Sequence, residues 1–203
     1  MKGISNLSII LERLKVALNL GNKRLVQAIL YALCEDLKKI YRYLIKPKIS
    51  VFEKRRQIDR MKEICVEYTE LISNNIQMIG DINISILIET TGMLYKAGCT
   101  EIMDRIFEKI FIISKKNLNN LAHLADTLIE CGCIDLAFKV LKYLLDKNYH
   151  NKSAVLINLA ISSYMLGSPR KAKVYAEAYE SLTKKSPSLK TSLRIVLGEV
   201  VGN

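Results

Sequence analysis

The sequence predicts an all-helical protein, and its composition supports this class. Glycine (9) and proline (3) are scarce among the 203 residues, whereas sandwiches and barrels need these residues in many turns. Half of the residues are hydrophobic and a quarter are charged, which is typical of a folded chain that can bury a sizeable core. The long stretches without glycine or proline therefore favour long helices.

The N-terminal 80 residues predict a helix hairpin followed by one long helix. The hairpin would consist of residues 7–20 and 23–45, with a turn at Gly21. Ser50-Val51-Phe52-Glu53 matches the capping box that starts a helix, and neither glycine nor proline follows up to Ile79. Apolar residues on this helix recur every three or four positions: Ile58, Met61, Cys65, Tyr68 and Ile72. We expect this stripe to pack on neighbouring helices, with contact to a second chain as the alternative.

Three later segments share a glycine at regular spacing. Gly98, Gly132 and Gly167 are 34 and 35 residues apart, which matches the 34-residue period of one class of helix-hairpin repeats. Small residues recur in register with these glycines: Thr91, Ala125 and Ala160 seven positions before, and Ala137 and Ala172 five positions after the second and third. In this period and these small positions the chain resembles the tetratricopeptide repeat (TPR) family.

The resemblance implies a right-handed α-α superhelix of TPR-like helix hairpins in a single domain, residues 1–203. Residues 1–80 would form a degenerate hairpin plus the long helix, and residues 83–185 three TPR-like repeats. Residues 186–203 would form a C-terminal capping helix that closes the last repeat.

In TPR proteins the concave face is lined mainly by the first helix of each hairpin. The family pattern places the following residues in this groove: Ile88, Tyr95, Lys96, Asp126, Ile129, Glu130, Ile157, Ile161 and Tyr164. The lining is mostly apolar, so a peptide or a partner's helix would be held by side-chain burial. The resemblance thus implies a non-enzymatic scaffold for protein–protein interaction. The alternative for the groove is that the N-terminal half of the chain fills it.

Positive charge concentrates in one segment. The net charge is +11, and residues 38–62 alone contribute +8 from ten basic and two acidic side chains. The ten form a predicted polyanion patch: Lys38, Lys39, Arg42, Lys46, Lys48, Lys54, Arg55, Arg56, Arg60 and Lys62. Tyr41, Tyr43 and Phe52 lie among them, and such a patch is expected where a protein contacts nucleic acid or another polyanion. Nucleic-acid binding is the alternative function, although a helix dipole by itself favours cations in the last helical turn.

We predict no catalytic, cofactor or metal site. The glycines are scattered singly, and neither His123 nor His150 shows an acidic partner at helical spacing, so neither a phosphate-binding loop nor a nucleophile–base pair is indicated. The five cysteines are an odd number without a regular framework, and we expect them to be small buried apolar residues. Cys131 and Cys133 are closer together than paired zinc ligands usually are.

The sequence also predicts a cytoplasmic protein. Its N-terminus lacks the unbroken apolar stretch of a signal peptide, and charged residues interrupt every apolar run well before the ~20 residues that cross a bilayer. The expected partner is a protein, either a peptide, a helix or a second copy, with nucleic acid as the alternative.

Overall fold

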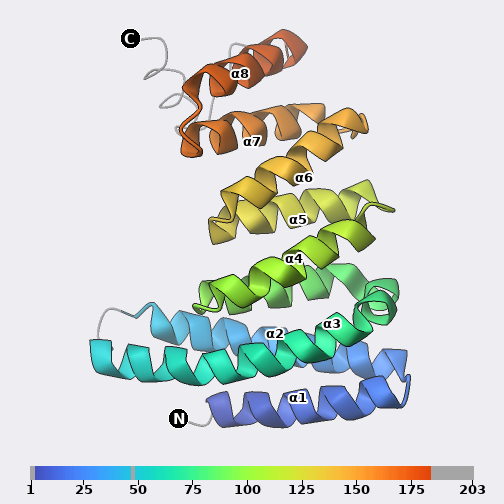
Figure 1. Ribbon diagram of the computed structural model, residues 1–203, viewed down its shortest axis with the longest axis vertical. Coiled ribbons are helices and arrows are strands. Elements are labelled where there is room, and N and C mark those ends of the chain that lie inside the picture. The colour runs from blue at the N-terminus through green and yellow to red at the C-terminus, as the bar shows by residue number, and fades with distance from the viewer. Residues whose placement is uncertain (1–2, 47–48, 184–203) are drawn as a thin grey trace. The chain divides into compact units, whose positions relative to one another are not determined.

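The computed structural model describes residues 3–46 and 49–183, which form eight α-helices and no β-strand (Figure 1). The predicted all-helical class is confirmed for these residues, while the predicted capping helix at 186–203 lies outside them. The helices are α1 (Gly3–Asn19), α2 (Lys23–Leu44), α3 (Val51–Lys96), α4 (Thr100–Ser114), α5 (Leu118–Cys131), α6 (Ile134–Asp146), α7 (Lys152–Met165) and α8 (Pro169–Thr183).

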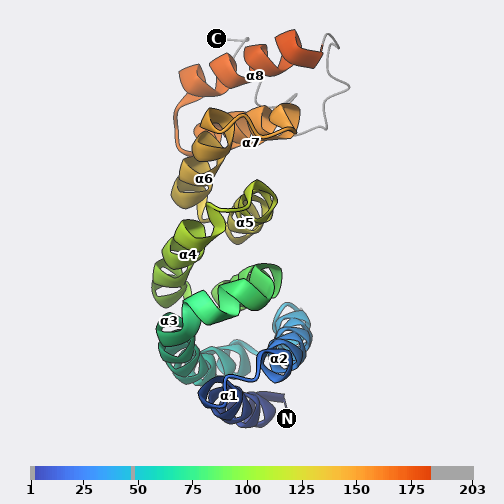
Figure 2. The same ribbon diagram turned by 90° about the vertical axis from the view of Figure 1, so that its right-hand side faces the viewer.

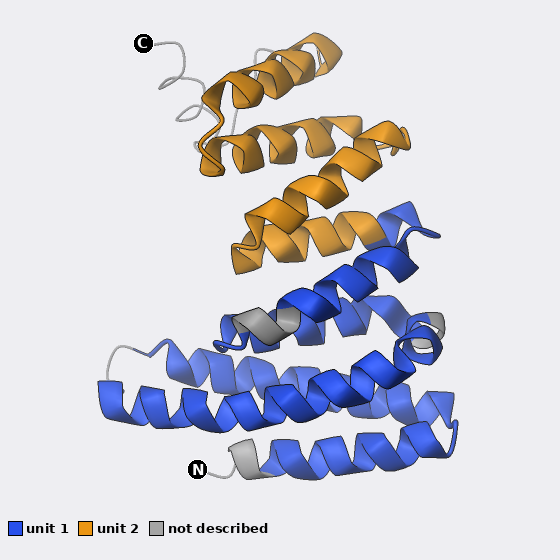
Figure 3. Cartoon of the chain, in the orientation of Figure 1, with its two compact units in different colours: residues 1–120 blue, residues 121–203 orange. Residues whose placement is uncertain are grey.

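The chain forms two compact units, residues 1–120 (unit 1) and residues 121–203 (unit 2), which Figure 3 shows in different colours. Unit 1 contains α1 to α4, and unit 2 contains most of α5 and α6 to α8. We predicted one domain with an internal change at residues 80–83. The boundary between the compact units lies within α5.

The turns at the four predicted glycines share one hydrogen-bond pattern. Gly21, Gly98, Gly132 and Gly167 all have φ between 63° and 105°. Each glycine N–H donates to the carbonyl three residues before it, and the next N–H donates to the carbonyl five residues before itself, at 2.8–3.2 Å. This is the Schellman motif, which ends a helix and favours glycine because the backbone is left-handed there.

The turn between α6 and α7 has the same pattern without a glycine. Asn148 has φ 54°, its N–H donates to the carbonyl of Leu145, and the N–H of Tyr149 donates to that of Leu144, both at 3.0 Å. Asparagine is one of the few other residues that tolerate this conformation.

The long helix α3 consists of two helical parts, because the backbone at Asn83 is extended (φ −165°, ψ 92°). The predicted start is confirmed, since Ser50 Oγ accepts a hydrogen bond from the Glu53 N–H at 3.1 Å. The oxygen of the Asn83 side chain accepts hydrogen bonds from the N–H groups of Ser85 and Ile86 at 3.1 and 3.3 Å. Asn83 therefore caps a new helix, and the chain reverses direction there (Figure 1 and Figure 2).

Contacts between distant segments hold unit 1 together. The fully buried Tyr68 hydroxyl lies 3.2 Å from Thr91 Oγ1, which joins the two parts of α3. A disulfide joins Cys65 in α3 to Cys99 before α4, with 6.3 Å between their Cα atoms. Both cysteines are buried, as expected, but their pairing was not predicted, because it depends on the reversal at Asn83 that returns the chain to the level of Cys65.

Small residues pack the helices of unit 2. The side chains of Ala125, Ala137, Ala160 and Ala172 are all buried, as expected from their register with the turn glycines. Between α7 and α8, Ala160 and Ala176 form a buried contact against which larger side chains pack. The rings of Phe138 and Tyr175 add an edge-on contact at 6.3 Å.

Candidate functional site

Two surfaces emerge as candidate sites, and the first is a face of unit 2 made by α5 and α7. Asn158 Nδ2 donates a hydrogen bond to Asp126 Oδ1 at 3.2 Å, which ties these two helices together. Six predicted groove residues share this α5–α7 face by helical spacing: Asp126, Ile129 and Glu130 on α5, and Ile157, Ile161 and Tyr164 on α7. The two acidic side chains are exposed and the four large side chains are half-buried.

The apolar part of the α5–α7 face is held in place by buried residues of α7 and α8. Ile157 and Ile161 pack against the buried contact between Ala160 and Ala176, together with Tyr175. Their exposed surface is therefore fixed before any partner arrives. Preformed apolar surface of this kind binds with a smaller ordering cost than a flexible segment does.

The electrostatics of the face centre on Asp126. Loss of hydration raises the pKa of the Asp126 carboxyl above its ordinary value, and the nearby Glu130 raises it further, while His123 and the hydrogen bond from Asn158 lower it. Our prediction is that His123 has no acidic partner at helical spacing. That is wrong, since Asp126 is three residues further along the same helix.

The three other predicted groove residues belong to unit 1. Ile88 is fully buried, so its assignment to a surface groove is wrong. It lies in the second part of α3, where Glu89 contacts α2 and Thr91 contacts the first part of α3. Tyr95 is half-buried with its ring 6.0 Å from that of Phe107, and Lys96 is also half-buried.

The second candidate surface lies where α2 ends and α3 begins, within the predicted polyanion patch. Three of its lysines are already paired with acids: Lys38 with Glu35 and Glu89 at 2.9 and 3.4 Å, Lys39 with Asp36 at 2.7 Å, and Lys62 with Asp59 at 3.4 Å. Three of these acids fall outside residues 38–62. The charge of the segment therefore overstated the charge available to a ligand.

The remaining cations form a smaller surface, which we call the α2–α3 corner. Among the described residues, these side chains make no ion pair: Arg42, Lys46, Lys54, Arg55, Arg56 and Arg60. Lys48 lies outside the part of the chain that the structure describes. Large apolar side chains are exposed beside these cations, with Val51 at 83% and Phe52 at 79%.

The helix dipole explains the cations at the end of α2 but not those at the start of α3. Arg42 lies in the last turn of α2 and Lys46 follows its C-terminal end, where the dipole favours a cation. Lys54, Arg55 and Arg56 lie in the first turns of α3, where the dipole favours an anion. Helix stability explains the first pair and not the second group.

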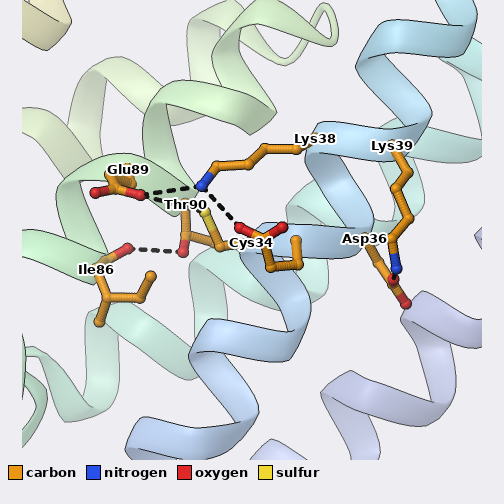
Figure 4. Close-up of polar contacts among 8 residues, drawn as sticks. Cys34, Asp36, Lys38, Lys39, Ile86, Glu89 and Thr90 are labelled. Carbon is orange, nitrogen blue, oxygen red and sulfur yellow. Dashed lines mark hydrogen bonds and ion pairs between the residues drawn. The ribbon is translucent and has the colours of Figure 1, made fainter.

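Figure 4 shows a further cluster that the sequence did not indicate. Cys34 Sγ lies 3.7 Å from Glu89 Oε2, to which Lys38 is also paired. Burial raises the pKa of the Cys34 thiol to about 11, so it is protonated at neutral pH and a poor nucleophile. The cluster joins α2 to the second part of α3.

Neither a metal cluster nor a membrane span is found in the described residues. No three His, Cys, Asp or Glu side chains there are grouped so that they could hold a metal ion. None of the described helices combines the length and the apolar character that crossing a bilayer requires. No protein-family model matches the chain, and comparison with curated proteins and with solved structures gives no match either.

Proposed function

We propose that this chain is a non-enzymatic protein-interaction module of TPR-like helix hairpins, which holds a peptide or a partner's helix on the α5–α7 face. The observation that carries this proposal is the hydrogen bond between Asp126 and Asn158. It joins α5 to α7, which would be the first helices of two successive hairpins in a TPR-like arrangement. The four turn glycines and the buried alanines of unit 2 support the same arrangement.

The chemistry of the α5–α7 face suits an amphipathic segment. Ile129, Ile157, Ile161 and Tyr164 offer apolar surface whose burial contributes about 25 cal/mol per Å². Asp126 and Glu130 at the edge would accept hydrogen bonds from the partner's N–H groups or pair with its lysine or arginine side chains. The expected ligand is therefore a helix or peptide with apolar anchors and a basic flank.

Site-specific crosslinking tests where partners bind. A photoreactive phenylalanine analogue replaces Tyr164 in one variant and the exposed Val174 of α8 in a matched control, and adducts are identified by mass spectrometry. We expect the same proteins to be captured repeatedly at position 164 and not at 174. Equal capture at both positions would contradict binding on the α5–α7 face.

A cytoplasmic location is part of the same proposal. The Cys65–Cys99 disulfide argues against it, because such bonds are rare in the cytosol, so the redox state of these two cysteines is the test. Cytosolic thiols are kept reduced, so cytoplasmic protein that is alkylated at lysis should carry both Cys65 and Cys99 as labelled thiols. A protected Cys65–Cys99 pair at the moment of lysis would place the protein in an oxidising compartment instead.

The α2–α3 corner supports a second candidate function, the binding of nucleic acid or another polyanion. The specific observation is that Lys54, Arg55 and Arg56 are placed at a helix start where the dipole disfavours them. Residues that break such a local rule are often retained for function. Exposed Phe52 and Tyr43 beside them could stack on bases.

A salt-titrated mobility-shift assay with DNA and RNA tests this second function. The variant R55E/R56E/R60E should lose retardation, and the logarithm of the wild-type binding constant should fall linearly with that of salt concentration. The matched control R170E/K171E/K173E changes the net charge equally on α8 and should retain binding. Absence of a shift at low salt, or equal loss in the control, would exclude specific use of the corner.

A further inference from the structure

An apolar groove lies on the exposed side of α1 in unit 1. Its volume is about 620 Å³, and its lining comes from α1 and α2, chiefly Ile9, Glu12, Arg13, Val16, Leu25 and Ile29. Ile9 is 53% exposed and Val16 is 54% exposed, while the opposite side of α1 is buried through Leu7, Leu11 and Leu14. Helix α1 thus has two apolar sides, and unit 1 covers one of them.

Two charged residues interrupt the exposed side of α1. Glu12 and Arg13 lie between Ile9 and Val16, and neither takes part in an ion pair with any described residue. Burial is the main cause that raises the pKa of the Glu67 carboxyl in α3, and the nearby charge of Glu12 raises it further. A cation supplied from outside would relieve this repulsion, just as an outside anion would pair with Arg13.

We propose that the groove binds a second copy of this chain, with the two α1 helices antiparallel about a two-fold axis between residues 12 and 13. Antiparallel helices related in this way place each residue opposite the one that is equally far from the axis. Ile9 then faces Val16 of the second copy, and Glu12 faces Arg13 of the second copy. The symmetry makes each of these contacts twice.

The order of residues along α1 is what favours a second copy over another protein. Ile9, Glu12, Arg13 and Val16 follow one another in the order apolar, acidic, basic, apolar. When a second α1 lies antiparallel to the first, each acid meets a base and each apolar residue meets an apolar residue, so the same surface can serve on both copies. Leu25 and Ile29 of α2 widen the apolar contact on each side. The groove shares no residue with the α5–α7 face or with the α2–α3 corner. The dimer proposal can therefore be tested without assuming either proposed function.

Charge-reversed variants test the pairing, with association measured by sedimentation equilibrium over a concentration series. E12R leaves two arginines opposite each other and R13E leaves two glutamates, so each variant should be monomeric alone. An equimolar mixture of E12R and R13E should form a one-to-one dimer, because every acid then faces a base. The double variant E12R/R13E should also dimerise by itself.

Further variants separate the interface from folding and from general charge effects. Ile9→Ser should weaken dimerisation on the order of a hundredfold, since the lost contact occurs twice. E108R and K109E reverse an adjacent exposed acid–base pair on α4 and should leave dimerisation unchanged. Circular dichroism should show the same helix content in all variants, because the altered side chains are exposed.

Three outcomes would overturn the proposal. The first is a wild-type chain that stays monomeric at every concentration. The second is a dimer that survives both single reversals, since its interface would then lie elsewhere. The third is loss of the dimer in both single variants with no recovery in the mixture or in E12R/R13E, which would leave the reciprocal Glu12–Arg13 pairing without support.

Discussion

Units 1 and 2 are both built of antiparallel helices, but different interactions hold them together. Unit 1 depends on specific contacts between residues far apart in sequence: the Cys65–Cys99 disulfide, the Tyr68–Thr91 contact, and the pairing of Lys38 and Cys34 with Glu89. Unit 2 depends on small residues that let neighbouring helices approach closely. The two parts of α3 lie on either side of a chain reversal and are held together by specific contacts between their side chains. The regular hairpins of unit 2 are held together mainly by the close fit of small side chains.

The largest expected effect comes from Tyr68 in unit 1. Tyr68→Ala would leave a cavity between the two parts of α3 and should destabilise the unit by about 3–5 kcal/mol. Tyr68→Phe loses only the contact with Thr91 and should cost about 1 kcal/mol. Hydrogen exchange resolved by residue should show the loss of protection in unit 1. An equal loss throughout unit 2 would show that the two units unfold as one.

Removal of the Cys65–Cys99 disulfide should come next. A crosslink that closes a loop of 34 residues stabilises a fold by about 3–4 kcal/mol on the chain-entropy model. The variant C65S/C99S should therefore melt earlier than the wild type under non-reducing conditions, by calorimetry. C131S/C133S in unit 2 is the control for the cost of buried serine hydroxyls and should lower the melting temperature by less than C65S/C99S does. If reduction with a phosphine leaves the wild-type melting temperature unchanged, the disulfide contributes nothing.

Unit 2 should instead be sensitive to added volume. Ala160→Leu puts a large side chain into the buried contact with Ala176 and should cost about 1–3 kcal/mol. Ala178→Leu on the exposed side of α8 is the control, and it should change the stability by less than about 0.5 kcal/mol. Urea denaturation of the two variants measures the difference. Similar midpoints for both would contradict close packing of α7 on α8.

The reversal within α3 should depend on the cap at Asn83. Asn83→Ala removes the acceptor for the N–H groups of Ser85 and Ile86 and should cost about 1 kcal/mol. Asn83→Asp keeps the acceptor and should cost less. Exchange of the amides of residues 84–88 should increase in the alanine variant before that of residues 60–75 changes. Uniform exchange along α3 would indicate one continuous helix.

The smallest effect concerns the pH dependence of unit 2. The pKa of the Asp126 carboxyl is raised in the folded chain, so the folded state binds its proton more tightly than the unfolded state does. Stability should therefore fall as pH rises from the ordinary aspartate pKa through the raised one, and then stay constant. Asp126→Asn should flatten this part of the profile while it keeps an oxygen that can accept from Asn158. If the melting temperatures of the wild type and of Asp126→Asn depend on pH in the same way, the raised pKa of Asp126 is contradicted.

Local signals in the sequence predicted the elements of the fold well. Four glycines marked turns because a left-handed backbone almost requires glycine, and Ser50 marked the start of α3 because its side chain caps the helix. Asn148 takes the same turn conformation, but asparagine is common elsewhere and gives a weaker signal. The change predicted between residues 80 and 83 coincides with the break at Asn83, but the sequence did not identify Asn83 as the cap.

Contacts between distant segments could not be predicted in the same way. The Cys65–Cys99 disulfide depends on the chain reversal at Asn83. The burial of Ile88 depends on the packing of the second part of α3, which contacts α2 and the first part of α3. Lys38 pairs with Glu89, which is 51 residues further along the chain, so a count of local charge assigned it to the polyanion patch. Of the nine residues that the family pattern assigned to a groove, six lie on α5 and α7 and three lie in unit 1.

The most direct test of the proposed function is a titration of a partner identified by the crosslinking at position 164. Its affinity is measured by calorimetry at low and high salt for the wild type, Tyr164→Ala and R55E/R56E/R60E. We predict that Tyr164→Ala weakens binding at least tenfold at both salt concentrations, and that the triple variant binds as the wild type does. Loss of binding in the triple variant with full binding by Tyr164→Ala would contradict the α5–α7 face and assign the interaction to the α2–α3 corner.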